Sequence, residues 1–237
     1  MKNCIFICLI FCINFNYAQI ISTDRPSAQT DNSYSLYHKA FQIESGLIYS
    51  SVNDEIQNSS VPNLLFRYGL LDRLELRFST NLLHTTIEKE FIISPLQFGT
   101  KIQLLREEKY QVAFLSMYSF NEQASEVLTK IVGGYSISDN FNIGYTFGYL
   151  SAKKFVDKSL NYSIFLSNSF NDKISAFLEF YGNTKYNLET PINQLNFDLG
   201  VSYLITNKMQ VDAYFGTGLN NDMYFGSIGF SYLFNKF

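Results

Sequence analysis

Long runs of alternating apolar and polar residues constrain the fold of this chain more than any other feature. In the clearest run, small polar residues separate the apolar residues Phe141, Ile143, Tyr145, Phe147 and Tyr149. Successive side chains of a strand point to opposite faces, so a period of two predicts strands with one apolar face. Similar runs begin at Phe41, Leu74, Leu96 and Leu195. Their length of roughly ten residues suits a tilted membrane strand better than a soluble strand, which averages about five or six.

Two kinds of connection separate the predicted strands. Short polar turns surround Asp72, Glu107, Asp139, Asp172 and Asn207, at spacings of 35, 32, 33 and 35 residues. Longer connections fall between them, at residues 52–60, 84–94, 121–126, 151–158, 184–193 and 218–222. Short periplasmic turns, longer outer loops and an even strand number are typical of bacterial outer-membrane barrels. The predicted fold is therefore all-β, an up-and-down antiparallel transmembrane β-barrel of about 12 strands.

A soluble β-sandwich is the alternative fold, and the distribution of charge argues against it. Charged residues make up 16% of the chain, against about 25% in ordinary soluble domains. The apolar faces of the strands carry almost no charge. A lipid-facing surface requires this, because an ionised side chain at mid-bilayer costs about 2–4 kcal/mol. A formal net charge of −3 also argues against nucleic acid as a partner, which would need a basic patch.

Residues 1–18 have the pattern of a secretory signal peptide. Lys2 precedes an apolar run at residues 4–13, and Ala18 is a small residue suited to cleavage. The run is about half as long as a membrane-spanning helix, so cleavage near Ala18 is favoured over an uncleaved anchor. All three cysteines lie in this stretch, so the exported chain is predicted to have no disulfide and no thiolate chemistry. The expected organisation is a signal peptide at 1–18, an N-terminal segment at 19–39 and a barrel at 40–237.

Three stretches of the sequence resemble a known family. STDRPSAQTD at residues 22–31, followed by FQIESGLIYS at 41–50, is similar to the opening of the outer-membrane transporter family named for the MetA pathway of phenol degradation. LLFRYGLLDRLELR at 64–77 resembles its second hairpin, and residues 196–234 resemble its closing strands. The resemblance implies an outer-membrane channel for small molecules, sometimes linked to uptake of aromatic compounds. The terminal aromatic Phe237 is typical of outer-membrane assembly signals and implies the barrel-assembly machinery as a partner.

Strand parity places nine charged residues in the predicted lumen: Glu44, Arg67, Glu75, Arg77, Lys101, Lys130, Glu179, Asp198 and Asp212. Basic residues fall on the second, third, fourth and sixth predicted strands, and acidic residues on the first, ninth, tenth and eleventh, with Glu75 the exception. A positive wall would therefore face a negative wall. Either the walls face each other across an open pore, where the field can orient dipolar solutes, or the charges pair and fill a narrow barrel.

The motif Thr23, Asp24, Arg25 and Pro26 precedes the first predicted strand and so lies at the periplasmic end. Two alternatives are open for this motif. The segment is an exposed tether, or it folds into the lumen as a plug, where its charges pair. Pro26 fixes a local turn and no more.

An enzyme is a further alternative, because outer-membrane lipid-modifying enzymes use Ser and His near the outer leaflet. His84 lies at the outer end of the third predicted strand, but no serine stands two residues away on the same strand face. The chain has only two histidines, His38 and His84, and no cysteine beyond the signal. We therefore expect no catalysis, no metal cluster and no cofactor.

The sequence thus predicts a passive channel surrounded by outer-membrane lipid. Small solutes, aromatic or apolar ones among them, would descend their own gradients through a polar lumen, which needs no reaction. A structural or adhesive barrel that uses its outer loops is the alternative.

Overall fold

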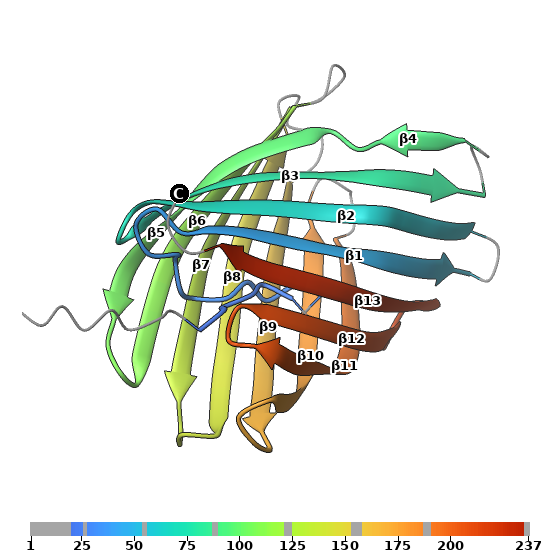
Figure 1. Ribbon diagram of the computed structural model, residues 1–237. Coiled ribbons are helices and arrows are strands. Elements are labelled where there is room, and N and C mark those ends of the chain that lie inside the picture. The colour runs from blue at the N-terminus through green and yellow to red at the C-terminus, as the bar shows by residue number, and fades with distance from the viewer. Residues whose placement is uncertain are drawn as a thin grey trace, which may run out of the picture.

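In the computed structural model the chain forms a closed antiparallel β-barrel (Figure 1). The structure describes residues 20–25, 28–53, 56–86, 90–120, 125–152, 158–186 and 191–234. The predicted signal peptide, Pro26 and Phe237 lie outside these residues. In the described ranges, no helix is long and apolar enough to cross a membrane.

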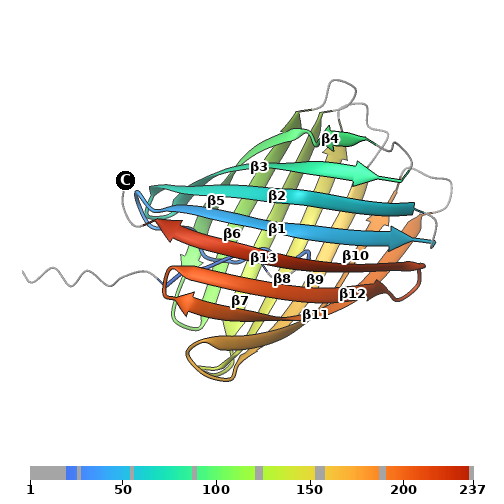
Figure 2. The same ribbon diagram turned by 45° about the vertical axis from the view of Figure 1, so that its right-hand side comes forward.

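The alternating runs of the sequence form the strands of the barrel wall. The strands in the described residues are β1 (Phe41–Val52), β2 (Ile56–Leu71), β3 (Leu74–Thr85), β4 (Phe91–Ile93), β5 (Leu96–Arg106), β6 (Tyr110–Phe120), β7 (Glu126–Ser136), β8 (Phe141–Ala152), β9 (Lys158–Ser169), β10 (Ile174–Lys185), β11 (Ile192–Thr206), β12 (Met209–Gly218) and β13 (Met223–Phe234). All except β4 pair in chain order around the wall, and β13 closes it against β1, from Phe41↔Phe234 to Val52↔Met223 (Figure 2). The predicted 12-stranded up-and-down barrel is confirmed.

Strand β4 corrects the prediction of a plain loop at residues 84–94. β3 continues to Thr85, and Phe91–Ile93 pair back against its last residues, at the end with the long loops, from Leu82↔Ile93 to His84↔Phe91. Aromatic and β-branched residues favour an extended backbone, and β4 pairs with the same strand as β5 in nearly the same register, so β4 extends the β5 strand beyond an interruption at residues 94–95. β5 pairs with the first half of β3, from Leu74↔Ile102 to Ser79↔Gln97, and continues the ring.

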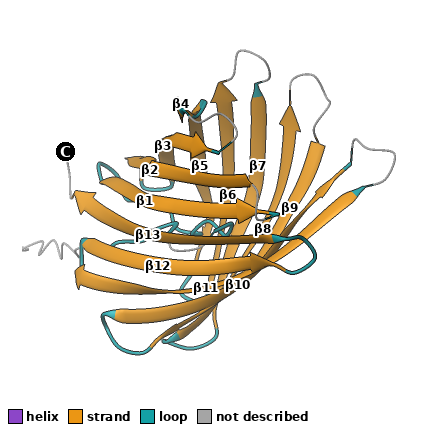
Figure 3. Ribbon diagram, turned by 90° about the vertical axis from the view of Figure 1, so that its right-hand side faces the viewer, coloured by secondary structure: helices purple, strands orange, loops and turns teal. Residues whose placement is uncertain are grey.

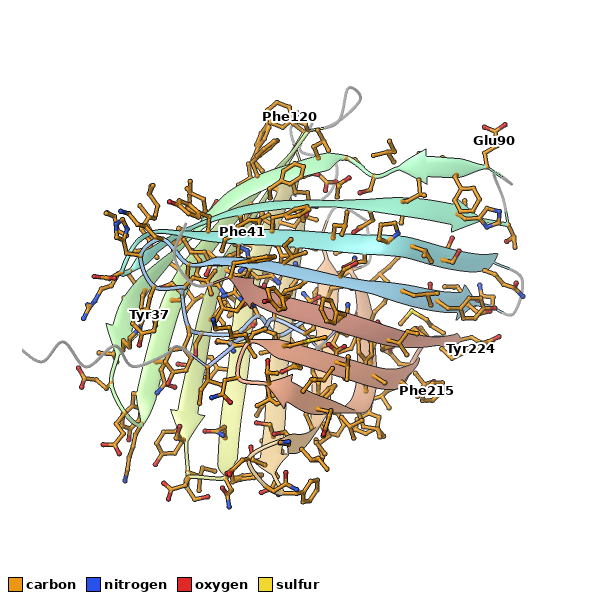
Figure 4. All side chains as sticks on the ribbon, viewed as in Figure 1. Tyr37, Phe41, Glu90, Phe120, Phe215 and Tyr224 are labelled. Carbon is orange, nitrogen blue, oxygen red and sulfur yellow. The ribbon has the colours of Figure 1, made fainter. Side chains whose placement is uncertain are left out.

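The outer face of the barrel is apolar, as the alternation in the sequence predicts. Phe147 and Leu199, at mid-strand, are 56% and 51% exposed. Phe215 and Tyr224 point away from the barrel in Figure 4. The inner face holds the charged and amide side chains, which are buried. Alternation along each strand therefore separates an apolar outer surface from a polar interior.

Strands β6 and β7 are the exception to this separation, since both of their faces are apolar. Leu115, Met117 and Val132 point inward, are at most 8% exposed and form a cluster with Leu128. The alternation is blurred at residues 110–136 for this reason. The interior thus has one apolar patch between its charged regions.

The N-terminal segment, residues 20–40, runs through the interior before the chain enters β1 (Figures 1 and 3). Its two ends pack at the end of the barrel that bears the short turns. Ile21, Leu36 and Ala40 form a buried cluster with Leu233 of β13. At Gly69 of β2, a Cβ atom would lie 1.9 Å from the carbonyl oxygen of Tyr37. Only glycine permits this close approach of the segment to the wall.

Candidate functional site: the charged interior of the barrel

All nine charged residues that parity assigned to the lumen are buried, each at most 8% exposed. They are Glu44 on β1, Arg67 on β2, Glu75 and Arg77 on β3, Lys101 on β5, Lys130 on β7, Glu179 on β10, Asp198 on β11 and Asp212 on β12. A buried charge is costly unless it is paired and hydrogen-bonded. The partners of these nine residues therefore show what the interior is built to hold.

Arg67 is neutralised within the wall itself. Its Nε donates to Oε1 of Glu75 at 2.8 Å, and its Nη1 donates to Oε1 of Glu44 at 2.9 Å. Nη1 also donates to the carbonyl oxygen of Ser22 at 2.6 Å, and Nη2 to that of Tyr34 at 3.1 Å. The wall acids balance this charge, and the N-terminal segment adds neutral acceptors.

Asp24 of the N-terminal segment binds the neighbouring cations. Its carboxylate accepts hydrogen bonds from Nη2 of Arg77 and, at 3.2 Å, from Nζ of Lys101. Arg67 Nη1 lies 4.0 Å from the same carboxylate. Burial raises the pKa of Asp24, but the attraction of Arg77, Lys101 and Arg67 outweighs it and holds the pKa well below its usual range. Asp24 is therefore a carboxylate at any physiological pH.

Asp31 has a similar set of partners, a lysine and the same arginine. Its Oδ2 accepts a hydrogen bond from Nζ of Lys130 at 2.6 Å, and its Oδ1 accepts one from Nη2 of Arg77 at 3.4 Å. Both lysines also donate to backbone carbonyl oxygens of the segment. Nζ of Lys101 donates to the carbonyl oxygen of Asn32 at 2.7 Å, and Nζ of Lys130 donates to that of Gln29 at 3.4 Å. Two carboxylates of the segment thus share one guanidinium.

Arg25 points to the opposite wall. Its Nη2 lies 3.1 Å from Oδ1 of Asp212 and donates to Oγ of Ser227 at 2.7 Å. The side chain occupies a slot made by Gly46 and Gly229, which are paired across β1 and β13. A Cβ atom at these positions would lie 2.8 Å and 2.0 Å from atoms of the Arg25 side chain. The missing side chains of two facing glycines make room for one guanidinium.

Backbone N–H groups of the N-terminal segment satisfy the remaining acidic residues. Glu179 accepts from the N–H groups of Ala28, Gln29 and Thr30 at 2.9, 3.2 and 2.6 Å. Glu44 accepts from those of Asp24 and Arg25 at 3.0 and 3.1 Å. The segment therefore binds wall carboxylates through backbone N–H groups and Arg25, and it binds wall cations through Asp24, Asp31 and backbone carbonyl oxygens.

Asp198 is the exception in the interior. It is fully buried and pairs directly opposite Glu179 across β10 and β11. Neither of its carboxylate oxygens has a hydrogen-bond partner within the described residues. Two carboxylates thus face each other on one wall, and only Glu179 is bound by the segment.

Two cavities lie in the interior, one on each side of the N-terminal segment. A cavity of about 400 Å³ is lined by wall residues near the short turns, and one of about 190 Å³ by wall residues nearer the long loops. Asp24, Arg25, Thr30 and Asp31 line both. The segment is therefore the partition between them.

The expected alternative of opposed charges facing across an open pore does not describe this arrangement. The basic and acidic residues lie on the predicted sides of the barrel, but the N-terminal segment stands between them and pairs with both. Asp31 was missed at the sequence level, although it closes the quoted STDRPSAQTD stretch. Its role depends on a contact with Lys130, 99 residues away, for which no local pattern exists.

The histidines lie away from this interior. His84 packs against Phe91, with ring centroids 5.0 Å apart. His38 Nδ1 lies 2.8 Å from the carbonyl oxygen of Leu70. Among the described residues, no group of three or more His, Cys, Asp or Glu side chains is arranged to hold a metal ion.

A closed barrel with an apolar outer face and a charged interior defines a β-barrel protein of the outer-membrane type. The sequence matches the family described as "Putative MetA-pathway of phenol degradation" over residues 23–234, and the chain belongs to that family. The resemblance seen in the three sequence stretches is thereby confirmed. No curated protein matches the sequence.

Solved structures with a similar fold include outer-membrane channels. An outer-membrane channel from Pseudomonas putida F1 aligns with a TM-score of 0.68 at 11% identity, covering 85% of this chain and 98% of that chain. The KdgM porin in complex with disordered oligogalacturonate aligns with a TM-score of 0.62 at 8% identity, covering 82% and 99%. The CymD monoaromatic hydrocarbon channel aligns with a TM-score of 0.51 at 9% identity, covering 84% and 90%. At identities this low, the structural similarity shows a shared fold and nothing more.

Proposed function

We propose that this protein is an outer-membrane channel for small solutes and that its N-terminal segment closes it in the conformation described here. The observation that carries the proposal is the pair of interior cavities that the segment borders on both sides. Removing residues 20–40 from the interior would join them into one polar passage between the two ends of the barrel. The channels and porins of similar fold support this function.

The contacts of the N-terminal segment support a plug rather than a permanent part of the wall. No strand pairing ties its charged part to the barrel, and its side chains bind through ion pairs that water can replace. The slot at Gly46 and Gly229, which admits the Arg25 side chain, supports a wall shaped for the segment. The exposed tether considered from the sequence would need no such slot.

Export and assembly complete the proposal. Cleavage near Ala18 would free the N-terminal segment to enter the barrel from the periplasmic end, where the short turns lie. The apolar outer wall would contact outer-membrane lipid, and the barrel-assembly machinery would insert it. The family's link to phenol degradation and the similarity to the monoaromatic hydrocarbon channel CymD suggest aromatic or apolar solutes, while the charged interior favours polar solutes.

A removable disulfide tests the plug directly. An ideal Cβ at Gly134 would lie 3.8 Å from Cβ of Ser33, within the range of about 3.5–4.5 Å that a disulfide requires. Ser33→Cys with Gly134→Cys would therefore lock the segment to β7. The exported chain contains no other cysteine, because all three lie at positions 4, 8 and 12.

The lock is best placed in a background in which Asp24→Asn and Arg25→Gln loosen the N-terminal segment. In planar bilayers we expect no conductance from the oxidised protein and clear single-channel openings after reduction. Each single-cysteine variant serves as a control and should conduct in both states. Equal conductance before and after reduction would refute the plug. A folded, reduced barrel that never conducts would favour the structural or adhesive alternative.

A further inference from the structure

Two carboxylates of the N-terminal segment share one cluster of wall cations. Asp24 binds Arg77 and Lys101, and Asp31 binds Arg77 and Lys130. Arg77 therefore lies between two carboxylates, and each carboxylate has a lysine on its outer side. The three cations come from β3, β5 and β7, so the rigid wall and not the segment sets their spacing.

These three cations depend on the segment in a way that Arg67 does not. Arg67 keeps Glu44 and Glu75 as partners within the wall. Lys101 faces Glu75 across β3 and β5, but the carboxylate of Glu75 binds Arg67 and Arg77. Within the described residues, the only ion pairs of Lys101 and Lys130 are with Asp24 and Asp31. If the segment leaves, two buried lysines lose their counter-ions and Arg77 loses two of its three.

The arrangement specifies the chemistry of a replacement. A buried cation needs an anion with hydrogen-bond acceptors, and here two anionic groups fit around one guanidinium. Asp24 and Asp31 are seven positions apart in the chain, yet their carboxylates meet at the same Nη2 atom. One small molecule with two carboxylates could make the same contacts. The cavity of about 190 Å³ that borders Arg77, Lys130 and Asp31 gives such a molecule access.

We propose that Arg77, Lys101 and Lys130 form a binding site for small dicarboxylates and that Asp24 and Asp31 occupy it in this structure as a tethered substitute. The inference rests on the proposed channel function and names its solute class. A tethered group competes at an effective concentration in the millimolar range. Free dicarboxylate therefore displaces the N-terminal segment only when it is abundant, and Asp24→Asn with Asp31→Asn removes the competitor.

The test compares three solutes of nearly equal size and different charge: succinate, succinamate and succinamide. Their uptake into proteoliposomes is measured for the wild type, for Asp24→Asn with Asp31→Asn, and for that double variant with Lys101→Gln and Lys130→Gln added. In the double variant we expect succinate to enter at least tenfold faster than succinamide, with succinamate between them. Removing the lysines should abolish this preference and leave succinamide uptake unchanged. Lys109→Gln with Lys173→Gln, in exposed turns, removes the same charge and should preserve the preference.

Binding in detergent distinguishes a wrong site from a wrong function. Millimolar succinate should raise the unfolding temperature of the double variant, and sulfate at equal ionic strength or succinamide should not. Equal uptake of all three solutes without stabilisation by succinate would overturn the dicarboxylate site while leaving the channel intact. Stabilisation by succinate without any uptake would support the site and refute the channel. Stabilisation by sulfate as strong as that by succinate would also overturn the site, because a compact dianion cannot span both lysines.

Discussion

The two charged walls of the barrel interior hold the N-terminal segment by different chemistry. The basic wall, Arg67, Arg77, Lys101 and Lys130, binds the side-chain carboxylates of Asp24 and Asp31. On the acidic wall, Glu179 accepts from backbone N–H groups and Asp212 binds one guanidinium, whereas Asp198 does not bind the segment. Any residue can supply a backbone N–H, whereas only a few can supply a carboxylate. The basic wall is therefore the more specific of the two and depends more on the sequence of the segment.

The largest effect is expected from neutralising the basic wall. Arg67→Gln, Arg77→Gln and Lys101→Gln together would leave Asp24, Glu44 and Glu75 without their main cations. Removing one partner of a buried ion pair costs about 3–5 kcal/mol, so the folded barrel should lose at least that much stability. The loss can be measured as a lower temperature of the transition in heat-modifiable gel mobility.

The matched control for this variant changes three lysines in the short turns, Lys109, Lys173 and Lys208, to Gln. It removes the same net charge and should leave the transition temperature within a few degrees of the wild type. If the interior variant is as stable as this control, the wall cations face water, and the paired interior described here is wrong.

A smaller effect is expected from the acidic wall when Arg25 is changed to Gln. Asp212 loses its cation, but a glutamine amide can still reach Ser227 or the carboxylate. Hydrogen bonds to charged groups contribute about 1.5–3 kcal/mol, and the loss of stability should fall in that range. Chemical unfolding in detergent measures it. Arg25→Lys keeps the charge without the fork of donors and should recover only part of the loss.

Much of the barrel could be predicted from the sequence because its wall follows a local rule. Alternation placed Phe147 and Leu199 outside and the nine charged residues inside, since a strand's side chains depend only on parity. The rule failed at β6 and β7, where Leu115, Met117 and Val132 face inward. It also missed β4, because Ser94 and Pro95 interrupt the alternation between Phe91–Ile93 and the strand that begins at Leu96.

The partners inside the barrel could not be predicted in the same way. The N-terminal segment has no strand or helix period, so its conformation follows from contacts with strands far along the chain. Asp24 meets Arg77 and Lys101, and Arg25 meets Asp212, 187 residues away. The charges of Asp24 and Arg25 suggested ion pairs, but the wall that each would bind depends on the closed barrel. The slot of Gly46 and Gly229 depends on it too, because β1 and β13 meet only when the barrel closes.

At low pH, protonation of Asp24 should weaken the binding of the N-terminal segment to the basic wall. Because the wall cations lower the pKa of Asp24 well below its usual range, the docked segment favours the ionised carboxylate. This contribution is fully present above the ordinary aspartate pKa of about 3.9. It is lost progressively as the pH falls from there towards the lowered pKa of the docked state.

Channel opening in planar bilayers checks this pH dependence. Between pH 5 and pH 8 the closed fraction should not change through Asp24, and below about pH 4 openings should become more frequent. Asp24→Asn lacks the titrating group, so the difference between the wild type and this variant isolates its contribution. A wild-type closed fraction that falls between pH 5 and pH 8, with Asp24→Asn flat over the same range, would contradict the lowered pKa.

The smallest effect, and the one of opposite sign, is expected at Asp198. Two buried carboxyl groups that face each other across neighbouring strands cannot both ionise without a large cost, so such a pair gains little from carrying two negative charges. Asp198 faces Glu179 in this way, and its carboxylate oxygens accept no hydrogen bond within the described residues. Asp198→Asn should therefore leave assembly normal and keep or slightly raise the unfolding temperature. Asp212→Asn is the matched comparison. The same change there weakens the ion pair with Arg25 and should therefore lower the unfolding temperature. If both substitutions destabilise the barrel equally, Asp198 has a cation partner, and the acidic wall is as fully paired as the basic one.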